Sequence, residues 1–267
     1  MNSENLLEII VHNPLNDPNI EVSTLPFFFS YKTATDLIRV GRKNDGGYLV
    51  SKRDVDASDL LIGLGISDDW SFESDFVLIN KVPVVAYDGS VGRSVFLHQL
   101  IRNFYSGKRS DFLKTLKIYL AYKKFFKNDC LHIGKFVGLY YGYALMSEVL
   151  SSVESTNIFL KIDIEGGEYQ ILDDLIQNQH RINGLVMEFH DCNLHLQRIA
   201  VFIEKFSLSI VHIHANNCAP LFQHSGLPLA LEITFSKNAE QYNECIQPHP
   251  LDMPNNPNKD EFILDFT

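Results

Sequence analysis

Short apolar runs recur along the chain, and most of them end in glycine or in acidic residues. They lie at 60–65, 82–88, 130–134, 158–163, 183–191, 208–214 and 229–235. Runs of this length, followed by turn residues, are typical of buried strands. Between several of them, apolar residues recur at helical spacing, at 66–73, 93–127, 139–153, 168–178 and 194–206. Strands that alternate with helices predict an α/β fold with a parallel sheet, and the last strand, which no full helix precedes, is expected to be antiparallel.

The two ends of the chain have different patterns. Apolar residues from Leu6 to Ile10 predict a short helix, and a second helix is predicted to follow Phe27–Phe29 and to run through Ile38. We therefore expect an N-terminal helical cap over 1–40, a catalytic domain over 41–240 and a C-terminal tail over 241–267. The tail contains four prolines, so it is expected to be extended until its apolar residues 262–264 dock back onto the domain.

The composition fits one large folded domain. The chain has 267 residues, of which 45% are hydrophobic, and this suffices to bury a sizeable core. Its four cysteines lie far apart without a C-x-x-C pair, which argues against a zinc knuckle or a disulfide scaffold. Residues 1–11 lack the basic start of a secretory signal, and no uncharged apolar segment reaches the roughly 20 residues that cross a bilayer. We expect a soluble, cytoplasmic protein.

Charge is distributed unevenly along the chain. The formal net charge of −10 disfavours bulk nucleic-acid binding, yet residues 93–127 carry nine basic side chains and only one acid, Asp111. Aromatic and aliphatic residues alternate with the basic ones, so the segment is predicted to form one or two amphipathic helices inserted between strands. Either its basic face is simply solvated, or it forms a lid that attracts an anionic acceptor such as a sugar nucleotide, a phosphorylated sugar or a charged glycan.

A glycine turn and an acidic residue mark a candidate cofactor site. Gly63-x-Gly65 ends one strand, and Asp88 ends the next, about 20 residues later, where a carboxylate meets a ribose in Rossmann-type sites. Position 68 is Asp, where a dinucleotide fingerprint has its third glycine. Together with Asp69 and Glu73, it crowds negative charge onto a helix start that would otherwise hold a pyrophosphate. S-adenosylmethionine, a phosphate-free cofactor with a cationic centre, suits this charge better than NAD, so an NAD-dependent oxidoreductase is disfavoured.

The longest motif follows the strand at 158–163. It reads Lys161-Ile162-Asp163-Ile164-Glu165-Gly166-Gly167-Glu168, so Asp163 and Glu165 stand at the carboxyl end of the strand, where ligands bind in open α/β sheets. Alternation places Glu188 and His190 on one side of the next strand, and His212 and His214 on one side of the strand after it. We therefore expect Asp163, His190 and His214 to converge on one spot.

With these residues assembled, the chain resembles an FkbM-type S-adenosylmethionine-dependent methyltransferase over residues 40–236. Residues 161–168 are similar to that family's K-I-D-x-E-G-x-E signature, and Asp45-Gly46-Gly47-Tyr48, Gly63-x-Gly65 and Glu188-Phe189-His190 agree with the family more loosely. The resemblance implies a Rossmann-like seven-strand class I methyltransferase sheet with helices on both faces, and methyl transfer to a hydroxyl of a sugar or natural product. Residues 93–129 lie outside the shared signature, and their own pattern predicts a basic helical insertion. We therefore expect an O-methyltransferase that acts on a hydroxyl of a sugar, a nucleotide-linked sugar or a surface glycan.

The resemblance and the motifs together name the expected site residues. Leu61 stands where the family often has an acid, so the carboxylate that holds the methionine amino group is left open. The glycines at 46–47 have two interpretations, a plain hairpin turn or an edge of the cofactor pocket. The residues expected to bind S-adenosylmethionine are Asp45, Gly46, Tyr48, Gly63, Gly65, Ser67, Glu73, Asp88, Gly89 and Asp163.

Two mechanisms suit the predicted cluster of Asp163, Glu165, His190 and His214. In the first, His190 near its ordinary pKa of roughly 6.5 takes the proton of the attacking hydroxyl as a general base. In the second, a divalent metal bound by Asp163, His190 and His214 lowers the pKa of that hydroxyl. A catalytically inactive cofactor-binding module is a further alternative. Structural roles compete as well, since Asp163 can cap a helix, His214 can be a core histidine, and Tyr48 and Trp70 can be core aromatics.

Overall fold

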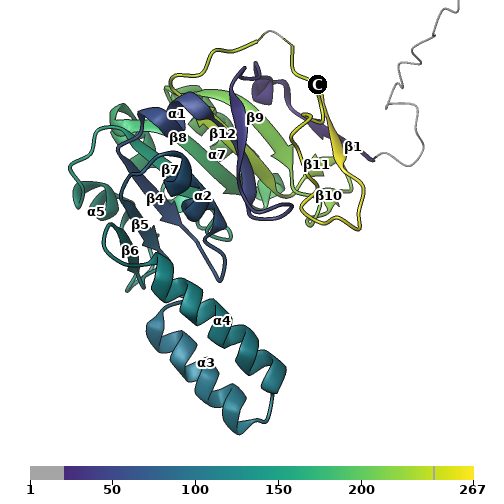
Figure 1. The fold of residues 1–267 in the computed structure, drawn as a ribbon. Helices are drawn as coiled ribbons and strands as arrows, with labels where there is room; N and C mark the ends of the chain where they lie inside the picture. The colour runs from purple at the N-terminus through teal and green to yellow at the C-terminus, as the bar shows by residue number, and fades with distance from the viewer. Residues whose placement is uncertain (1–20, 243) are drawn as a thin grey trace, which may run out of the picture.

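A seven-stranded sheet forms the centre of the computed structural model, which describes residues 21–242 and 244–267 (Figure 1). From edge to edge its strands are β6 (Cys130–Ile133), β5 (Val84–Tyr87), β4 (Leu60–Leu64), β7 (Ile158–Ile162), β8 (Ile182–Phe189), β12 (Leu231–Ser236) and β9 (Ser209–Ala215). Neighbours from β6 to β8 pair in parallel, whereas β12 is antiparallel to both β8 and β9. The predicted α/β class, the strands and the antiparallel last strand are confirmed, and this is the seven-strand sheet that the resemblance implied.

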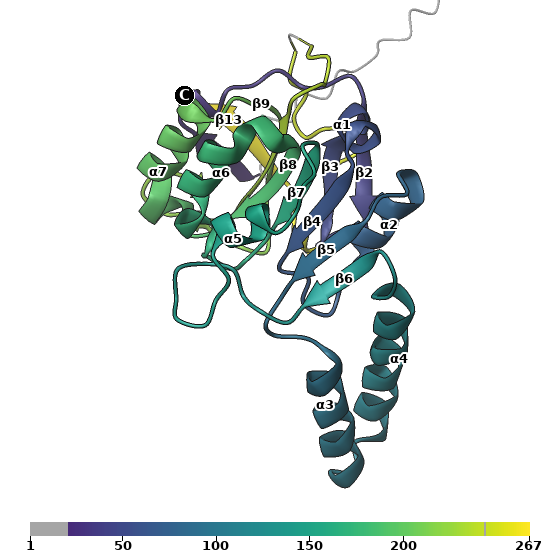
Figure 2. The same cartoon turned by 90° about the vertical axis from the view of Figure 1, so that its left-hand side faces the viewer.

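Both faces of the sheet are covered (Figure 2). One face packs against α5 (Met146–Ser151), α6 (Leu172–Asn178) and α7 (Cys192–Lys205) in the larger core cluster. The other face packs against α1 (Lys52–Ala57), α2 (Ser71–Ile79) and the hairpin of β2 (Leu37–Gly41) and β3 (Gly47–Ser51). Side chains alternate between these two cores along β7, where Leu160 belongs to the first and Phe159 to the second. Lys161 therefore lies on the face of α2 and β3.

The basic segment forms two antiparallel helices that project from the body. They are α3 (Arg93–Tyr105) and α4 (Arg109–Phe125), and in both views they extend away from the sheet beside β6 (Figures 1 and 2). Trp70, Tyr122 and Phe126 pack in a separate buried cluster that anchors the hairpin to the body. Trp70 is thus a core aromatic.

The helical cap predicted at the N-terminal end is wrong for its described part. Residues 21–40 contain β1 (Glu21–Leu25), the short 3-10 helix η2 (Phe27–Phe29) and most of β2. The segment through Ile38 is a strand because it pairs antiparallel with β3 across the turn at 42–46, so sheet pairing overrides the helical spacing. The helix predicted from Leu6 to Ile10 lies outside the described residues.

Two other predicted helices are shorter than expected. The helix at 139–153 begins only at Met146, because Gly138 and Gly142 adopt φ of 155° and 87°, which an α-helix does not allow. The helix at 168–178 is split into the 3-10 turn η3 (Glu168–Gln170) and α6. The loop at 134–145 that replaces the first of these helices forms a wall of the site described below.

The C-terminal tail docks onto the body, as predicted. Its last strand, β13 (Phe262–Phe266), pairs in parallel with β1. The remaining short elements are η4 (Gln179–Arg181), β10 (Leu221–Phe222) and β11 (Leu227–Pro228). Across the described part of the chain, no helix combines the length and apolarity needed to cross a membrane.

Candidate active site

Two adjoining cavities open at the carboxyl ends of β4, β5, β7 and β8. The first has a volume of about 450 Å³ and the second about 510 Å³. They share the residues Gly65, Ser67, Asp163 and Glu165 in their walls. One elongated ligand can therefore occupy both cavities and pass over the end of β7.

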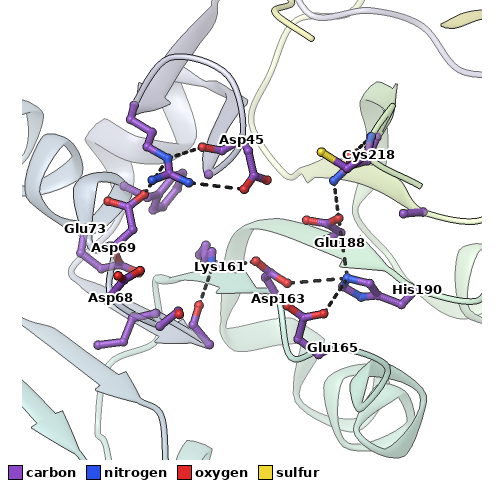
Figure 3. Close-up of a pocket in the computed structure, with 18 of the residues that line it drawn as sticks. Asp45, Asp68, Asp69, Glu73, Lys161, Asp163, Glu165, Glu188, His190 and Cys218 are labelled. Atoms are coloured by element: carbon purple, nitrogen blue, oxygen red, sulfur yellow. Dashed lines mark hydrogen bonds and ion pairs between the residues drawn. The ribbon is translucent and has the colours of Figure 1, made fainter. Parts of the chain in front are cut away.

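The first cavity is strongly acidic. Among the residues that the structure describes, Arg42 and Lys161 are the only lysine or arginine side chains that line it, and His190 also lines it (Figure 3). Its carboxylates come from the turn before β3, the loop after β4, the start of α2 and the ends of β7 and β8, and they are Asp45, Asp68, Asp69, Glu73, Asp163, Glu165 and Glu188. This excess of negative charge favours a cationic ligand.

Gly65 brings the ends of β4 and β7 into close contact. It has a φ of +75°, and a Cβ atom there would lie 1.6 Å from the carbonyl oxygen of Asp163. Only glycine fits this position without moving the backbone. The buried Lys161 also links the ends of β4 and β7. Its Nζ donates to the Gly65 carbonyl at 2.6 Å and lies 3.5 Å from Asp163 Oδ2.

Tyr48 holds two of the carboxylates from behind the cavity wall. Its hydroxyl lies 3.3 Å from Asp163 Oδ2 and 3.4 Å from Glu188 Oε2. Asn216 donates to the other oxygen of Glu188 at 2.7 Å. Burial raises the pKa of Glu188 to about 8, and the charges of Glu232 and Asp163 add to this effect. The predicted cofactor residue Tyr48 is therefore a buried positioning residue and does not line either cavity.

His190 lies just beyond β8, among carboxylates that point toward it (Figure 3). Its Nδ1 is 3.2 Å from the buried Glu168 Oε1, and its Nε2 is 4.0 Å from Asp163 and 3.6 Å from Glu165. Burial alone would lower the pKa of His190, but the hydrogen bond with Glu168 and the charges of Glu188, Glu168 and Asp163 raise it to about 9. The expectation of an ordinary pKa for His190 is thus wrong.

Glu73 is a buried carboxylate with an unused oxygen. It extends from the first turn of α2 over Gly63, where a Cβ atom would lie 2.5 Å from Glu73 Oε1. Glu73 is 1% exposed, and Oε1 has no hydrogen-bond partner among the described residues. Burial raises the pKa of Glu73 to about 7, against the lowering effect of Lys161. A buried carboxylate oxygen without a hydrogen-bond partner destabilises the fold. A cationic ligand that donates a hydrogen bond to this oxygen would remove that free-energy cost.

The second cavity combines Asp88 with aromatic side chains from the loop at 134–145. Asp88 Oδ2 accepts from the backbone of Ile66 and Ser67, and its Oδ1 accepts from the backbone and hydroxyl of Ser90. These bonds use the main acceptor positions of the carboxylate, so a ribose hydroxyl would have to share them. The aromatic side chains of the wall are Tyr87, Phe136, Tyr140 and Tyr143.

Most of the predicted cofactor residues lie together. Two glycines stand behind the walls without lining them: Gly63 lies under Glu73, and a Cβ atom on Gly89 would lie 2.5 Å from Phe136. Asp45 and Gly46 line the first cavity, so the glycine turn borders the pocket. The predicted residues that line one or both cavities are Asp45, Gly46, Gly65, Ser67, Glu73, Asp88, Asp163, Glu165 and His190.

The predicted convergence of His214 with Asp163 and His190 is wrong. His214 lies in a buried cluster under the C-terminal tail, where its Nδ1 is 2.9 Å from Glu232 and its Nε2 is 2.6 Å from Glu261. The neighbouring His212 lies 2.9 Å from Asp252 of the same tail. Both histidines face the tail because residues 252–261 pack over this part of β9 and β12. The cavity lies elsewhere along the sheet edge. The structural interpretation of His214 is the correct one.

We expect His214→Ala to destabilise the fold by about 3 to 5 kcal/mol, because it removes the histidine partner of the buried Glu232 carboxylate and of the partly buried Glu261 carboxylate. Urea unfolding followed by circular dichroism measures the change. His224→Ala, at an exposed position of the β10–β11 turn, is the matched control and should change stability by less than about 0.5 kcal/mol. Equal stability of the two variants would contradict this role of His214.

The same cluster predicts a dependence of stability on pH. Burial alone would lower the pKa of His214, but the charge of Glu232 and the hydrogen bonds with Glu232 and Glu261 raise it well above its ordinary value of 6.5. A histidine whose folded-state pKa is raised stabilises the fold fully below its unfolded pKa and loses this effect as the pH rises toward the folded value. The stability difference between wild type and His214→Ala should therefore be largest below pH 6.5 and should shrink at alkaline pH.

Several polar residues of the site are missing from the predicted list. Glu168 closes the signature at 161–168 and holds His190, while Glu188 and Lys161 lie on the cavity side of their strands. Alternation along the strands is the signal that points to Glu188 and Lys161. Asn216 and Cys218, which also line the first cavity, follow β9 and carry no such signal.

Comparison with known proteins gives one family match. The model of the methyltransferase FkbM domain matches residues 147–208, a stretch that contains β7, β8, α6 and α7. No curated protein matches the sequence.

Several solved structures share partial similarity with the chain. Precorrin-6y C5,15-methyltransferase from Geobacter metallireducens GS-15 is 12% identical, with a TM-score of 0.39 over 70% of this chain and 84% of that chain. An rRNA methylase from Streptococcus thermophilus is 10% identical, with a TM-score of 0.36 over 70% of this chain and 90% of that chain. The fibrillarin pre-rRNA processing protein of Methanococcus jannaschii is 9% identical, with a TM-score of 0.37 over 70% of each chain.

Proposed function

We infer that this chain, whose residues 147–208 match the model of the methyltransferase FkbM domain, transfers a methyl group from S-adenosylmethionine to a hydroxyl of a sugar, a nucleotide-linked sugar or a surface glycan. The family match and the seven-strand sheet support an S-adenosylmethionine-dependent methyltransferase. The observation that carries the proposal about the site is the pair of adjoining cavities that share Gly65 and Asp163. One of them is acidic and suits a cation, and the other has aromatic walls that suit a purine.

The second cavity suits the adenosine half of the donor. Phe136, Tyr140 and Tyr143 supply ring surfaces that favour a flat heterocycle. Asp88 would bind the ribose through oxygens that it shares with Ser90 and the backbone at 66–67. In this arrangement Asp88 also fixes the shape of the turn on which the donor lies.

The first cavity suits the methionine half. Glu73 is our candidate for the carboxylate that accepts from the α-amino group, because its Oε1 is buried, unpartnered and beside Gly63. Glu73 stands on α2 and lies against Gly63, which belongs to the same strand as Leu61. We therefore assign to Glu73 the role of the acid that Leu61 replaces. Asp163, at the junction of the two cavities, would lie beside the sulfonium.

His190 is our candidate for the general base. S-adenosylmethionine supplies an electrophilic methyl group, so the protein has to orient the acceptor hydroxyl and remove its proton. Glu168 holds Nδ1 of His190 and leaves Nε2 facing the cavity, on the side of Asp163 and Glu165. Because the surrounding carboxylates raise the pKa of His190 to about 9, the base form requires a positive charge nearby, and the sulfonium of a bound donor would lower the pKa of His190 by Coulomb repulsion.

A divalent metal is the second candidate for activating the hydroxyl, with a corrected set of ligands. Asp163, Glu165 and His190 each offer a ligand atom, and these atoms lie within 4.8 Å of one another. Two carboxylates and an imidazole suit a divalent first-row metal. Bound there, the ion would lower the pKa of the acceptor hydroxyl. His214 lies outside this group because Glu232 and Glu261 hold both of its nitrogens.

Ligand-induced stabilisation tests the proposed cofactor. We expect S-adenosylmethionine and its demethylated product to raise the melting temperature by several degrees at about 100 times Kd, since selective binding at that ratio stabilises the fold by about 2.7 kcal/mol. NAD at the same concentration is the control and should have no effect. A shift with NAD, or no shift with either form of the methyl donor, would contradict the proposal.

A further inference from the structure

A third cavity runs along the α3–α4 hairpin, from the turn between the two helices to the loops after β4 and β5, and adjoins the candidate active site. It has a volume of about 510 Å³, which is in the range of ligand-binding pockets. It shares Ser67 and Asp68 with the first cavity of the active site, and Ser67 and Ser90 with the second. A group bound in the third cavity can therefore belong to a molecule that reaches the active site.

Cationic side chains from both helices converge on this cavity. They are Arg102 on α3, Lys108 at the turn between the helices and Lys114 on α4. None of the three side chains has an ion-pair or hydrogen-bond partner among the residues that the structure describes. Two acids, Asp68 and Asp111, also line the cavity, so its lining keeps a net positive charge.

Neutral donors complete the lining. Gln99, Asn103 and Thr115 lie on the inner sides of the two helices, and Asn103 is 8% exposed and donates to the Thr115 hydroxyl at 3.2 Å. An arginine, two lysines and neutral amide and hydroxyl groups are a set that binds phosphate oxygens. The hairpin is also the one strongly basic segment of a chain whose net charge is −10.

We propose that this cavity binds the phosphate or diphosphate group of the methyl acceptor, while the acceptor hydroxyl reaches His190. This inference rests on the proposed function and narrows its substrate class to phosphorylated or diphosphate-linked sugars. It also assigns separate roles to the basic residues of the hairpin. Arg102, Lys108 and Lys114 bind the anion, whereas Lys123 and Lys124 line no part of this cavity.

Binding of inorganic pyrophosphate to the full chain tests the inference without relying on catalysis. Titration calorimetry in EDTA-containing buffer should detect pyrophosphate binding to the wild type. The double variant Arg102→Ala/Lys114→Ala should bind it about 10-fold or more weakly, because it loses two charge-assisted contacts. The control Lys123→Ala/Lys124→Ala loses the same charge outside the cavity and should stay within about twofold of the wild type.

The outcomes separate this inference from the proposed function. Equal weakening by the two double variants would show only a general charge effect and would overturn the subsite. Absence of pyrophosphate binding to a wild type that still binds S-adenosylmethionine would overturn the subsite alone. Melting curves of each variant establish that it is folded. In turnover assays, the Arg102→Ala/Lys114→Ala variant should have a lower kcat/KM than the wild type for a phosphorylated sugar. For an unphosphorylated sugar, kcat/KM should be unchanged.

Discussion

Replacing His190 with alanine is expected to lower kcat by about 100-fold or more, because a positioned general base contributes about 10²–10⁴ to the rate. The variant should keep its affinity for S-adenosylmethionine within about threefold, since in the proposed arrangement His190 acts on the acceptor hydroxyl and other residues hold the donor. Single-turnover kinetics at saturating donor, together with direct measurement of donor binding, separate these two effects.

A second histidine provides the matched control. His195 lies on α7, where its ring stacks on Tyr169 at 3.8 Å, and it lines neither cavity. His195→Ala should therefore leave kcat within about twofold. The same measurements with EDTA distinguish a base from a metal ligand. Loss of wild-type activity in EDTA would favour the metal bound by Asp163, Glu165 and His190. Full activity of His190→Ala in EDTA would rule out both roles of His190.

Replacing Glu73 with glutamine should weaken the binding of S-adenosylmethionine about 10-fold or more. The amide keeps the shape of the side chain but loses the charge, and a hydrogen bond between charged groups contributes about 1.5 to 3 kcal/mol. The fold should keep its stability, because burial already raises the pKa of Glu73 to about 7 and the amide removes a buried charge. Calorimetric Kd values and melting temperatures check both parts.

Two controls test the role of Glu73: a ligand without the amino-acid part, and a variant that removes a different carboxylate from the same cavity. Methylthioadenosine lacks the amino-acid part, so wild type and Glu73→Gln should bind it equally. Asp68→Asn removes an exposed carboxylate from the same cavity and should weaken S-adenosylmethionine binding by less than about threefold. If Glu73→Gln bound the donor as tightly as the wild type, another carboxylate would have to hold the amino group.

The sequence predicted the sheet well because its strands are locally defined. The runs at 60–65 and 158–163 are apolar on both faces and end in glycine or acid, so neither their type nor their end depends on distant residues. The segment 33–40 behaves differently. Its spacing fits a helix, and only the pairing of Leu37–Gly41 with Gly47–Ser51 makes it a strand. Such pairing is a tertiary effect that no local pattern records.

The residues of the candidate site also fall into those that local sequence patterns predict and those that depend on distant parts of the chain. Asp163, Glu165 and His190 were predicted together because parallel strands bring their carboxyl ends to one edge. His214 satisfies the same rule, but the tail at 252–261 covers its end of the sheet and binds it. The unpartnered oxygen of Glu73 and the raised pKa of His190 also depend on neighbours far away in the sequence, so they could be found only in the folded chain.

The acidic lining of the first cavity has a consequence for the catalytic cycle. In the proposed reaction, methyl transfer turns the sulfonium of S-adenosylmethionine into a neutral thioether, which the carboxylates of the first cavity attract less strongly. We therefore expect the demethylated product to dissociate faster than the unreacted methyl donor, so that loss of charge favours product release.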